Sequence, residues 1–432
     1  ATHRGVAASC GEVLLFVDHD DELGNELLTP LARSFETNPT VDFVYTDEDQ
    51  ISSTGRYVAP VFKPGPSPWL GLGFNYVTHA MAVRRRLYDL LGGLRSEFDG
   101  AQDHDFMLRA FEQARGVVHL PLVGYHWRRT PGSVAASTTA KPWAFEAGRR
   151  AIEAACRRRR LPLARVLAAR PTGVWHLEWQ ELTAPISVQV VLHGDAAGWP
   201  AWRRSLAEKN PLFHVMSWDE GSLPKSPVRA HVLCIDGALK PDLSVLQQLF
   251  GWGTLPGVLA VAAGAELGSR RTHLGYSIDR SGLAQPIEPG LPRRAVGPGL
   301  LGAAPREVAT SGDHLLLLNG AFEAQLQQLA GQPLTRANLL CLGLAGATLG
   351  APTVHLPKTG AQLSHRAGQH QQPVWLHLSP LWSSVKSQLP VDFWRNDVDR
   401  FCPRHELLTD LGIPAPITSA PTGANVVTPG RA

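Results

Sequence analysis

The sequence predicts an α/β fold in which strands and helices alternate, and three observations support this prediction. Short apolar runs rich in β-branched residues, such as 13–17, alternate with segments of helical periodicity, such as 23–37. Acidic residues follow the first apolar run, at the place where open α/β sheets bind ligands. A new alternation of the same kind begins at Ile186. We therefore expect two α/β units in one chain.

The composition is that of a soluble globular protein. The 432 residues are 44% apolar and 18% charged, which is enough for two or three domains with normal cores. A net charge of +3 is too small to argue for nucleic-acid binding. The five cysteines are scattered and form no CxxC pair, so we expect reduced buried thiols instead of disulfides or a zinc site. Glycines, Pro352 and His355 interrupt the longest apolar region, 339–356, which argues against a membrane span.

The stretch 11–23, GEVLLFVDHDDEL, organises the first unit. Its apolar part predicts a buried strand, and Asp18, Asp20 and Asp21 follow within four residues. Carboxylates this close repel one another, and a hard divalent cation with oxygen ligands relieves the repulsion. The alternative is a polar loop with an acidic helix start, because Asp and Glu favour the first helical turn. From these residues alone, both interpretations remain open.

The remaining elements of the first half follow from periodicity and from Gly and Pro positions. We expect an acidic turn at 46–49, a turn around Gly55, a proline-rich loop at 62–68 and a helix stop at Gly92-Gly93. The expected strands are 41–45, 76–83, 117–120 and 123–127, and the expected helices are 23–37, 84–91, 105–113 and 142–160.

The second half repeats the alternation after 161–185, which predicts a linker with a little strand structure. The region 264–312 is rich in Gly, Pro and Arg and predicts loops, and the tail from 413 to 432 predicts disorder. The expected strands are 186–192, 231–235, 257–263 and 314–318, and the expected helices are 202–209, 243–252, 323–329 and 338–349. We place the domains at 1–160 and 186–400, with a tail at 401–432.

Eight segments between residue 11 and about residue 155 resemble, in the same order, the inverting family-two glycosyltransferases with the GT-A fold. They are most similar to the polysaccharide and O-antigen group. Eight segments in order are more specific than a single DxD motif. The segments are VDHDDEL (17–23), YTDEDQI (45–51), FKP (62–64), NYVTHAMAVRR (75–85), FDGAQDHDFMLR (98–109), VHLPLVGYHWR (118–128), PGSVAAS (131–137) and KPWAFEAGRRAIEAA (141–155).

The resemblance implies a Rossmann-like, mixed and mainly parallel sheet that binds a nucleotide-sugar donor. The reaction would move the sugar to a hydroxyl of a glycan or lipid-linked glycan with inversion, in cell-surface polysaccharide synthesis. It implies work in the cytoplasm, in many members at the inner face of the cell membrane.

The resemblance also implies site residues. The DxD motif at Asp18 and Asp20 would hold Mn²⁺ or Mg²⁺, with Asp21 supporting the donor site, and Asp103 would be the general base toward the acceptor. For Asp103 the alternative is a helix N-cap. Further candidates are His126 for the metal, Lys63 and Arg128 for the diphosphate, and Asn75, Tyr76, His79 and Gln102 for the acceptor.

Each of these further candidates has a structural alternative. His126 is equally well explained as a structural histidine, and most Lys and Arg side chains bind no ligand. Asp47 and Asp49 would either face a substrate or form a solvated acidic turn. Asn75, Tyr76 and His79 are equally consistent with ordinary loop packing.

The chain departs from the family pattern in two ways. The opening βαβ unit that would carry the nucleoside is absent from the segment that resembles the family, so we expect the first copy to be incomplete. Residues 186–400 resemble a degenerate second copy, in which Asp236 alone remains of the acidic pair and 334–340, at the position of the base-bearing helix, has no carboxylate.

Three functions are therefore compared. The leading hypothesis is a metal-dependent glycosyltransferase whose first unit is catalytic. The main alternative is a non-catalytic pseudo-glycosyltransferase that acts as a scaffold or binds glycans. A nucleotidyltransferase on a similar fold is the third, and it would need a phosphate-binding loop after its first strand.

Overall fold

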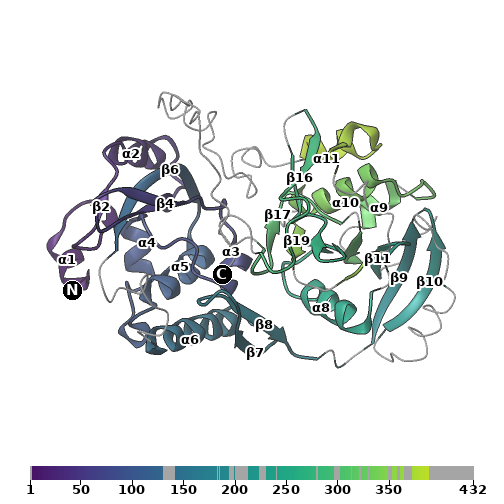
Figure 1. Ribbon diagram of the computed structural model, residues 1–432, viewed down its shortest axis with the longest axis horizontal. Helices are drawn as coiled ribbons and strands as arrows, with labels where there is room; N and C mark the ends of the chain where they lie inside the picture. The colour runs from purple at the N-terminus through teal and green to yellow at the C-terminus, as the bar shows by residue number, and fades with distance from the viewer. Residues whose placement is uncertain are drawn as a thin grey trace, which may run out of the picture.

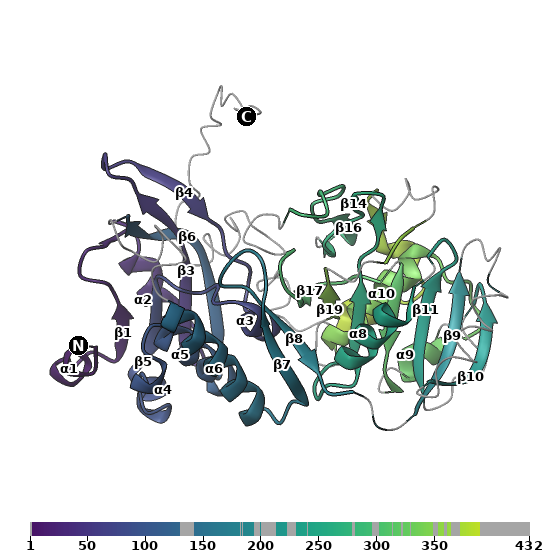
Figure 2. The ribbon, with the colours of Figure 1, turned by 60° about the horizontal axis from the view of Figure 1, so that its bottom comes forward.

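The computed structural model describes residues 2–129 and 142–388, apart from gaps at 182, 184, 194–198, 200–212, 223–229, 240, 279–280, 296–301, 313, 321–322, 329, 349–352, 358–360 and 364–371. The described residues form two large sheets, one in each half of the chain, with helices packed on them (Figures 1 and 2). The predicted α/β fold class is confirmed. The expected helix at 202–209, the segment 131–137 and the tail at 413–432 lie outside the described residues.

The first sheet has the strand order β1-β5-β3-β6-β2, with β4 hydrogen-bonded to β3. β3 and β6 run parallel, and the other described pairs are antiparallel. The sheet is mixed as predicted, with a smaller parallel share than the resemblance implies. Its strands are β1 (Val13–Phe16), β2 (Glu22–Leu23), β3 (Phe43–Ile51), β4 (Tyr57–Val61), β5 (Met81–Arg84) and β6 (Val117–Arg128).

Helices cover both faces of this sheet because side chains alternate along its strands. Val44 joins a core cluster with Leu31 and Phe35 of α2 (Leu28–Thr37). The residues on either side of it in the strand, Phe43 and Tyr45, point to the other face and join the cluster of α5 (Gln102–Gln113). The other helices of this half are α1 (Thr2–Ala8), α3 (Pro68–Gly73), α4 (Arg85–Leu90), the 3₁₀ turn η1 (Ser96–Phe98) and α6 (Pro142–Arg158).

β1 is an edge strand, and the prediction of a buried strand is wrong. Among the described strands it pairs with β5 alone, and Leu14 is its only buried residue. Its apolar run is explained by two different contacts. Leu14 belongs to the α5-side core, whereas Val13 and Leu15 line an open groove of about 560 Å³ together with residues of α2.

Two further predictions are corrected in β3 and β6. The expected acidic turn at 46–49 is part of β3, where Asp47, Glu48 and Asp49 are all buried. The two expected short strands around Pro121 are one continuous strand, β6. Register shifts at Thr46/Asp47 and Asp47/Glu48 let the two strands stay paired along their whole length. A charge-rich strand segment is possible here because each buried carboxylate has partners from neighbouring loops and strands.

The second sheet has the order β10-β9-β11-β18-β12-β19-β17. Its core strands alternate cleanly, because Leu233 and Leu317 pack on the side of α8 and Cys234 and Leu316 on the side of α10. The strands are β9 (Ile186–His193), β10 (Phe213–Glu220), β11 (His231–Asp236), β12 (Ala260–Ala263), β17 (Arg306–Val308), β18 (Leu315–Leu318) and β19 (Thr353–Leu356), and the helices are α8 (Leu243–Gly253), α9 (Glu323–Gln328), α10 (Arg336–Thr348), the 3₁₀ turn η5 (Leu376–Leu378) and α11 (Trp382–Gln388).

The strand structure expected in the linker is found, and short strands also occupy the region 264–312, which the sequence predicts as loops. Within 161–185, two strands form the hairpin β7 (Leu163–Ala168) and β8 (Trp175–Trp179). Within 264–312 and beyond, the small sheets are β13 (Glu266–Leu267) with β14 (Arg270–Arg271), and β15 (Tyr276–Ile278) with β16 (Leu283–Pro286) and β20 (Val374–Trp375).

The two sheets share a four-strand pattern. In the first, β1-β5-β3-β6 are joined by two antiparallel pairs and then a parallel one. In the second, β11-β18-β12-β19 have the same orientations and the same order along the chain. This agrees in topology with two tandem copies, whose common origin stays a prediction.

Two predictions from the sequence concern the state of the cysteines and the presence of a membrane-spanning helix. Cys10, Cys156, Cys234 and Cys341 are free thiols, the last three buried as expected and Cys10 exposed. Cys402 lies outside the described residues. None of the helices in the described ranges combines the length and the apolar character needed to cross a bilayer.

A buried ion pair fixes α5. The Asp105 carboxylate is fully buried and accepts hydrogen bonds from Nε of Arg109 at 2.9 Å and Nε of Arg95 at 3.0 Å. We expect Asp105→Ala to lower the free energy of unfolding by about 3–5 kcal/mol, because it leaves the Arg109 charge buried without its carboxylate. Urea unfolding measures this change. Glu146→Ala breaks an exposed pair with Arg149 on α6 and should cost less than about 1 kcal/mol; equal effects would contradict the prediction.

Candidate active site

The candidate site lies beyond the end of β1, beside the loop that precedes β5. Asp18 follows β1 closely, and the neighbouring strand β5 begins two residues after His79. The sheet pairing therefore brings the two side chains together, with Nε2 of His79 3.9 Å from Oδ2 of Asp18. The side chains of Asp18 and Asp20 are 66% and 40% exposed, so both carboxylates are accessible to a ligand.

Tyr125 and Asp21 fix the loop that carries Asp18 and Asp20. The Tyr125 hydroxyl donates to Oδ2 of Asp21 at 2.6 Å and accepts the backbone N–H of Asp18 at 3.0 Å. The backbone N–H of Arg128 donates to Oδ1 of Asp21 at 2.8 Å. Both oxygens of Asp21 are thus engaged in shaping the loop, and burial raises the pKa of the Tyr125 hydroxyl.

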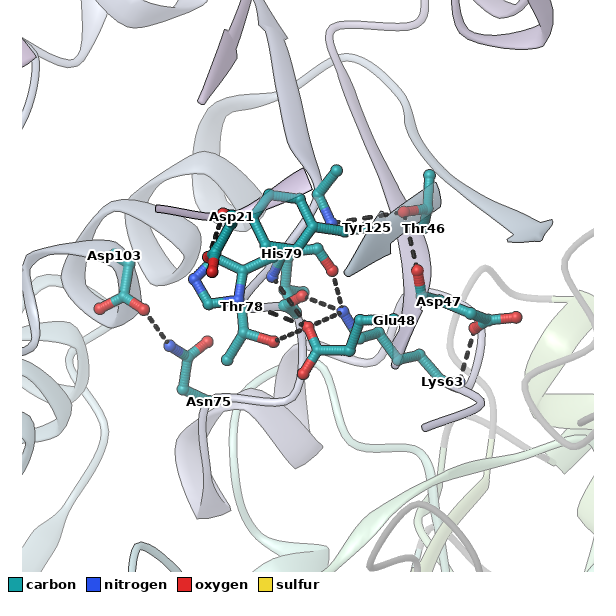
Figure 3. A network of polar contacts seen from close by, with 12 residues as sticks. Asp21, Thr46, Asp47, Glu48, Lys63, Asn75, Thr78, His79, Asp103 and Tyr125 are labelled. Carbon is teal, nitrogen blue, oxygen red and sulfur yellow. Dashed lines mark hydrogen bonds and ion pairs between the residues drawn. The ribbon is translucent and has the colours of Figure 1, made fainter. Parts of the chain in front are cut away.

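Glu48 and Lys63 form a buried ion pair beside the loop 77–79, which precedes β5 (Figure 3). Lys63 is 1% exposed, and its ammonium donates to Oε2 of Glu48 at 2.9 Å, to the Val77 carbonyl at 2.6 Å and to the His79 carbonyl. Burial alone would raise the pKa of Glu48, but Lys63, His79 and Thr78 outweigh it and lower that pKa to about 2. All three N–H groups of Lys63 are used, which leaves none for the diphosphate contact expected from the sequence.

His79 is the centre of the site. Its ring stacks on Tyr125 with 4.7 Å between centroids, and its Nδ1 is 3.5 Å from Oε2 of Glu48. Burial alone would lower the pKa of His79, but Glu48, with a smaller contribution from Asp103, outweighs burial and raises it. The fold therefore favours a charged imidazolium, which faces the Asp18 carboxylate from the protein side.

Asp103 lies in the first turn of α5. The helix begins at Gln102, and its N-cap is Ala101, so the alternative role of Asp103 as N-cap is wrong. Nδ2 of Asn75 donates to Oδ2 of Asp103 at 2.8 Å, and Figure 3 shows this pair beside His79. Gln102 Oε1 accepts the Gly100 N–H at 2.7 Å, a local contact at the start of the helix.

Two other predicted residues lie outside this group. His126 is on the opposite face of β6 from Tyr125, since successive residues of a strand alternate, and its Nδ1 is 2.5 Å from Oδ1 of Asp49. Tyr76 is 4% exposed, and its hydroxyl accepts the N–H of Ser67 at 2.7 Å. Asp18 and His126 are therefore separated by the sheet, and Tyr76 belongs to the core.

Arg128 remains beside the acidic loop. Its Nε donates to the Asp20 carbonyl at 2.7 Å, and its terminal nitrogen pairs with Glu22. Asp47, which the sequence leaves open as a substrate contact, is buried and accepts from Nε2 of His119 and the N–H of Lys63, each at 2.8 Å.

The carboxylates present fit a divalent cation that arrives with phosphate oxygens. Within the described residues, no group of three or more His, Cys, Asp or Glu side chains is arranged to hold a metal. Mg²⁺ sites on substrate phosphates typically use one or two protein carboxylates. Asp18 and Asp20, both exposed at the end of one loop, provide such a pair.

Glu48, Thr78 and Tyr125 were not among the residues predicted for the site. Thr78 Oγ1 donates to Oε2 of Glu48 at 2.7 Å, and Tyr125 packs beneath His79. The signal that could have found Glu48 is an acidic run that directly continues an apolar strand start, because a carboxylate buried there needs a cation.

The Glu48 pair has a testable dependence on pH. The pKa of Glu48 is lowered on folding, so its stabilisation is complete above about pH 4.5 and is lost as pH falls toward about 2. We expect Glu48→Gln to lower the free energy of unfolding at pH 7 by about 3 kcal/mol. The same variant should weaken the fall of this free energy as the pH drops below about 4.5. Urea unfolding from pH 2 to 7 measures both effects. The exposed Glu26→Gln should change neither, and a parallel pH profile for Glu48→Gln would refute the assignment.

Two curated proteins are similar in sequence to part of this chain. No protein-family profile matches the chain. The chain is 39% identical over 155 residues to the uncharacterized protein y4gI of Sinorhizobium fredii (strain NBRC 101917 / NGR234), covering 35% of this chain and 17% of that protein. It is 38% identical over 152 residues to the O-antigen biosynthesis protein RfbC of Myxococcus xanthus, covering 35% and 12%.

Solved structures overlap less well. The crystal structure of S. aureus TarS 1-349 superposes with a TM-score of 0.27 at 19% identity, over 35% of this chain and 42% of that one. Its complex with UDP gives a TM-score of 0.25 at the same identity and coverage. This overlap is too small to support an argument about fold or ligand.

The chain spans less than a fifth of the length of the curated relatives it matches. The matched stretches are comparable in length to the segment 11–155 that carries the resemblance. About a third of this chain is thus similar in sequence to part of a protein of O-antigen biosynthesis, which supports the resemblance.

Proposed function

We propose that the chain is an inverting glycosyltransferase of cell-surface polysaccharide synthesis, with its site in the first half. The observation that carries the proposal is the position of Asp18 beside His79, with Asp103 close enough to influence the pKa of His79. Asp18 and His79 are 3.9 Å apart, and Asp103 contributes to the raised pKa of His79. Exposed carboxylates, a half-buried histidine and a second carboxylate at the start of a helix can serve such a transfer.

In this proposal, one set of residues acts on the nucleotide-sugar donor and another acts on the acceptor. Asp18 and Asp20 would hold Mn²⁺ or Mg²⁺ together with the donor diphosphate, and such an ion neutralises the charge of the leaving group. On this side, the imidazolium of His79 and the guanidinium of Arg128 add positive charge. Asp103, oriented by Asn75, accepts the proton of the acceptor hydroxyl. The acceptor oxygen bonds to the anomeric carbon as the bond to the diphosphate oxygen breaks, which inverts the configuration.

The second half provides no equivalent site in our proposal. Asp236 occupies the end of β11, and Nδ1 of His314 is 3.5 Å from its Oδ2, an arrangement similar to Asp18 and His79. Asp236 is 5% exposed and His314 is fully buried, so a substrate has no access to this pair. This burial favours a structural role for the second half and is the observation that best fits a pseudo-glycosyltransferase scaffold.

Nucleotide binding tests the metal side. We expect Mn²⁺ to tighten the binding of at least one of UDP, dTDP and GDP, and Asp20→Ala to weaken that binding about tenfold or more, because it removes one of two carboxylates. Titration calorimetry with and without Mn²⁺ measures this. Asp89→Ala, an exposed change on α4, is the matched control. Equal Mn²⁺-dependent affinity in wild type and Asp20→Ala would eliminate the metal role.

Asp103→Asn tests the general base. The variant should retain nucleotide binding and lose about 10²- to 10⁴-fold in turnover, because the amide cannot accept the proton. The assay is release of nucleoside diphosphate from the matching nucleotide sugar, with water or a glycan as acceptor. Asp99→Asn, an exposed acid before α5, should behave as wild type. Unchanged turnover in Asp103→Asn would rule out the base assignment.

A further inference from the structure

Helix α3 lies where the two halves of the chain meet (Figures 1 and 2). It is only six residues long, and isolated helices of this length are not stable in water. A single residue, Phe74, separates its end from Asn75, the partner of Asp103. The packing of α3 therefore decides where this part of the site lies.

The first turn of α3 depends on a carboxylate of the second half. The Glu307 side chain, on β17, accepts the N–H of Trp69 at 2.9 Å and the hydroxyl of Ser67. Ser67 occupies the N-cap position but makes no capping bond of its own, and Pro68 has no N–H. Glu307 is 4% exposed, so the contact is shielded from water. A residue 238 positions away thus satisfies a backbone donor that the helix cannot satisfy itself.

The last residue of α3 also packs tightly on the second half. A Cβ atom added to Gly73 would overlap the Cβ of Ala304, whereas the Cα of Ala304 would stay at an ordinary 3.8 Å. Near the start of the helix, the ring of Trp69 also meets Trp252 of α8 edge to face, with 5.5 Å between centroids. Residues beyond 250 therefore hold the helix at its start and at its end.

From α3 the contact continues to the base-bearing helix by two hydrogen bonds. The Gly71 carbonyl accepts from Nε2 of His104 at 2.7 Å, and Asn75 donates to Asp103 at 2.8 Å. His104 is 3% exposed and adjacent to Asp103. A displacement of α3 would therefore move both partners of the first turn of α5.

We propose that the second half positions the acceptor side of the active site through α3, with Glu307 and Ala304 as positioning residues. This inference rests on the proposed function for its effect on turnover, and on the structure alone for the mechanical link. The donor side, Asp18 and Asp20, has no such contact among those described above. The link should therefore act on turnover more than on donor binding.

Hydrogen exchange in the full chain tests the mechanical link without any activity. Glu307→Ala should speed exchange of the backbone amides of 69–76 about tenfold, and Glu307→Gln, which keeps an acceptor for Trp69, less than threefold. Glu266→Ala is the matched control: it removes another buried carboxylate of the second half, which pairs with Arg293 at 3.1 Å and does not contact α3. Unchanged exchange of 69–76 in Glu307→Ala would overturn the proposal, as would an equal rise in Glu266→Ala.

A compensating pair tests the link to turnover. Gly73→Ala should lower kcat about tenfold with less than a threefold change in the KM of the donor, and adding Ala304→Gly should restore kcat to within threefold of wild type. Ala304→Gly alone is the control. A loss in Gly73→Ala that the second change does not restore would overturn the proposal. If the wild-type chain has no turnover, the proposed function fails. Hydrogen exchange of 69–76 then tests the mechanical link alone: Gly73→Ala should speed this exchange, and adding Ala304→Gly should restore it.

Discussion

The Glu48–Lys63 ion pair is the interaction on which the site depends. A charged pair this deeply buried is stable only when further hydrogen bonds complete it. Here the remaining N–H groups of Lys63 bind two carbonyls of the loop 77–79, and the remaining partners of Glu48 are Thr78 and the backbone N–H of His79. The desolvation of two charges is thus offset by fixing one loop. That loop holds the imidazole of His79 against Tyr125, facing Asp18.

Buried and exposed carboxylates have different roles in this chain. Glu48, Asp105 and Glu307 are buried, and each holds a loop or helix through partners that the fold supplies. The side chains of Asp18 and Asp20 are 66% and 40% exposed, so their charge is available to a ligand. Exposure, together with position at the end of β1, is therefore what distinguishes candidate ligands from structural acids in a sequence where both kinds occur in short acidic runs.

The sequence predicted the α/β class and most elements, because apolar periodicity and Gly or Pro positions reflect local packing. It could not predict that 46–49 continues β3, since the cation that makes burial of Glu48 possible, Lys63, is fifteen residues away in a loop. It placed the acidic pair after the first strand and Asp103 at the start of a helix, as the structure has them, and their roles in a reaction stay predictions. It misplaced His126 and Tyr76, because which face of a strand or loop is open depends on pairing partners such as Asp49 and Ser67.

The shared four-strand pattern lets the two halves be compared at one position. In the first half, the Asp–His pair at the strand ends is open; in the second, Asp236 and His314 are enclosed in the fold. A buried pair of this kind is closed to a ligand, and it contributes to packing. The same half supplies Glu307 to a helix that lacks its own cap. A unit whose Asp–His pair is enclosed, and whose Glu307 completes a helix of the first half, agrees better with a structural partner than with a second transferase.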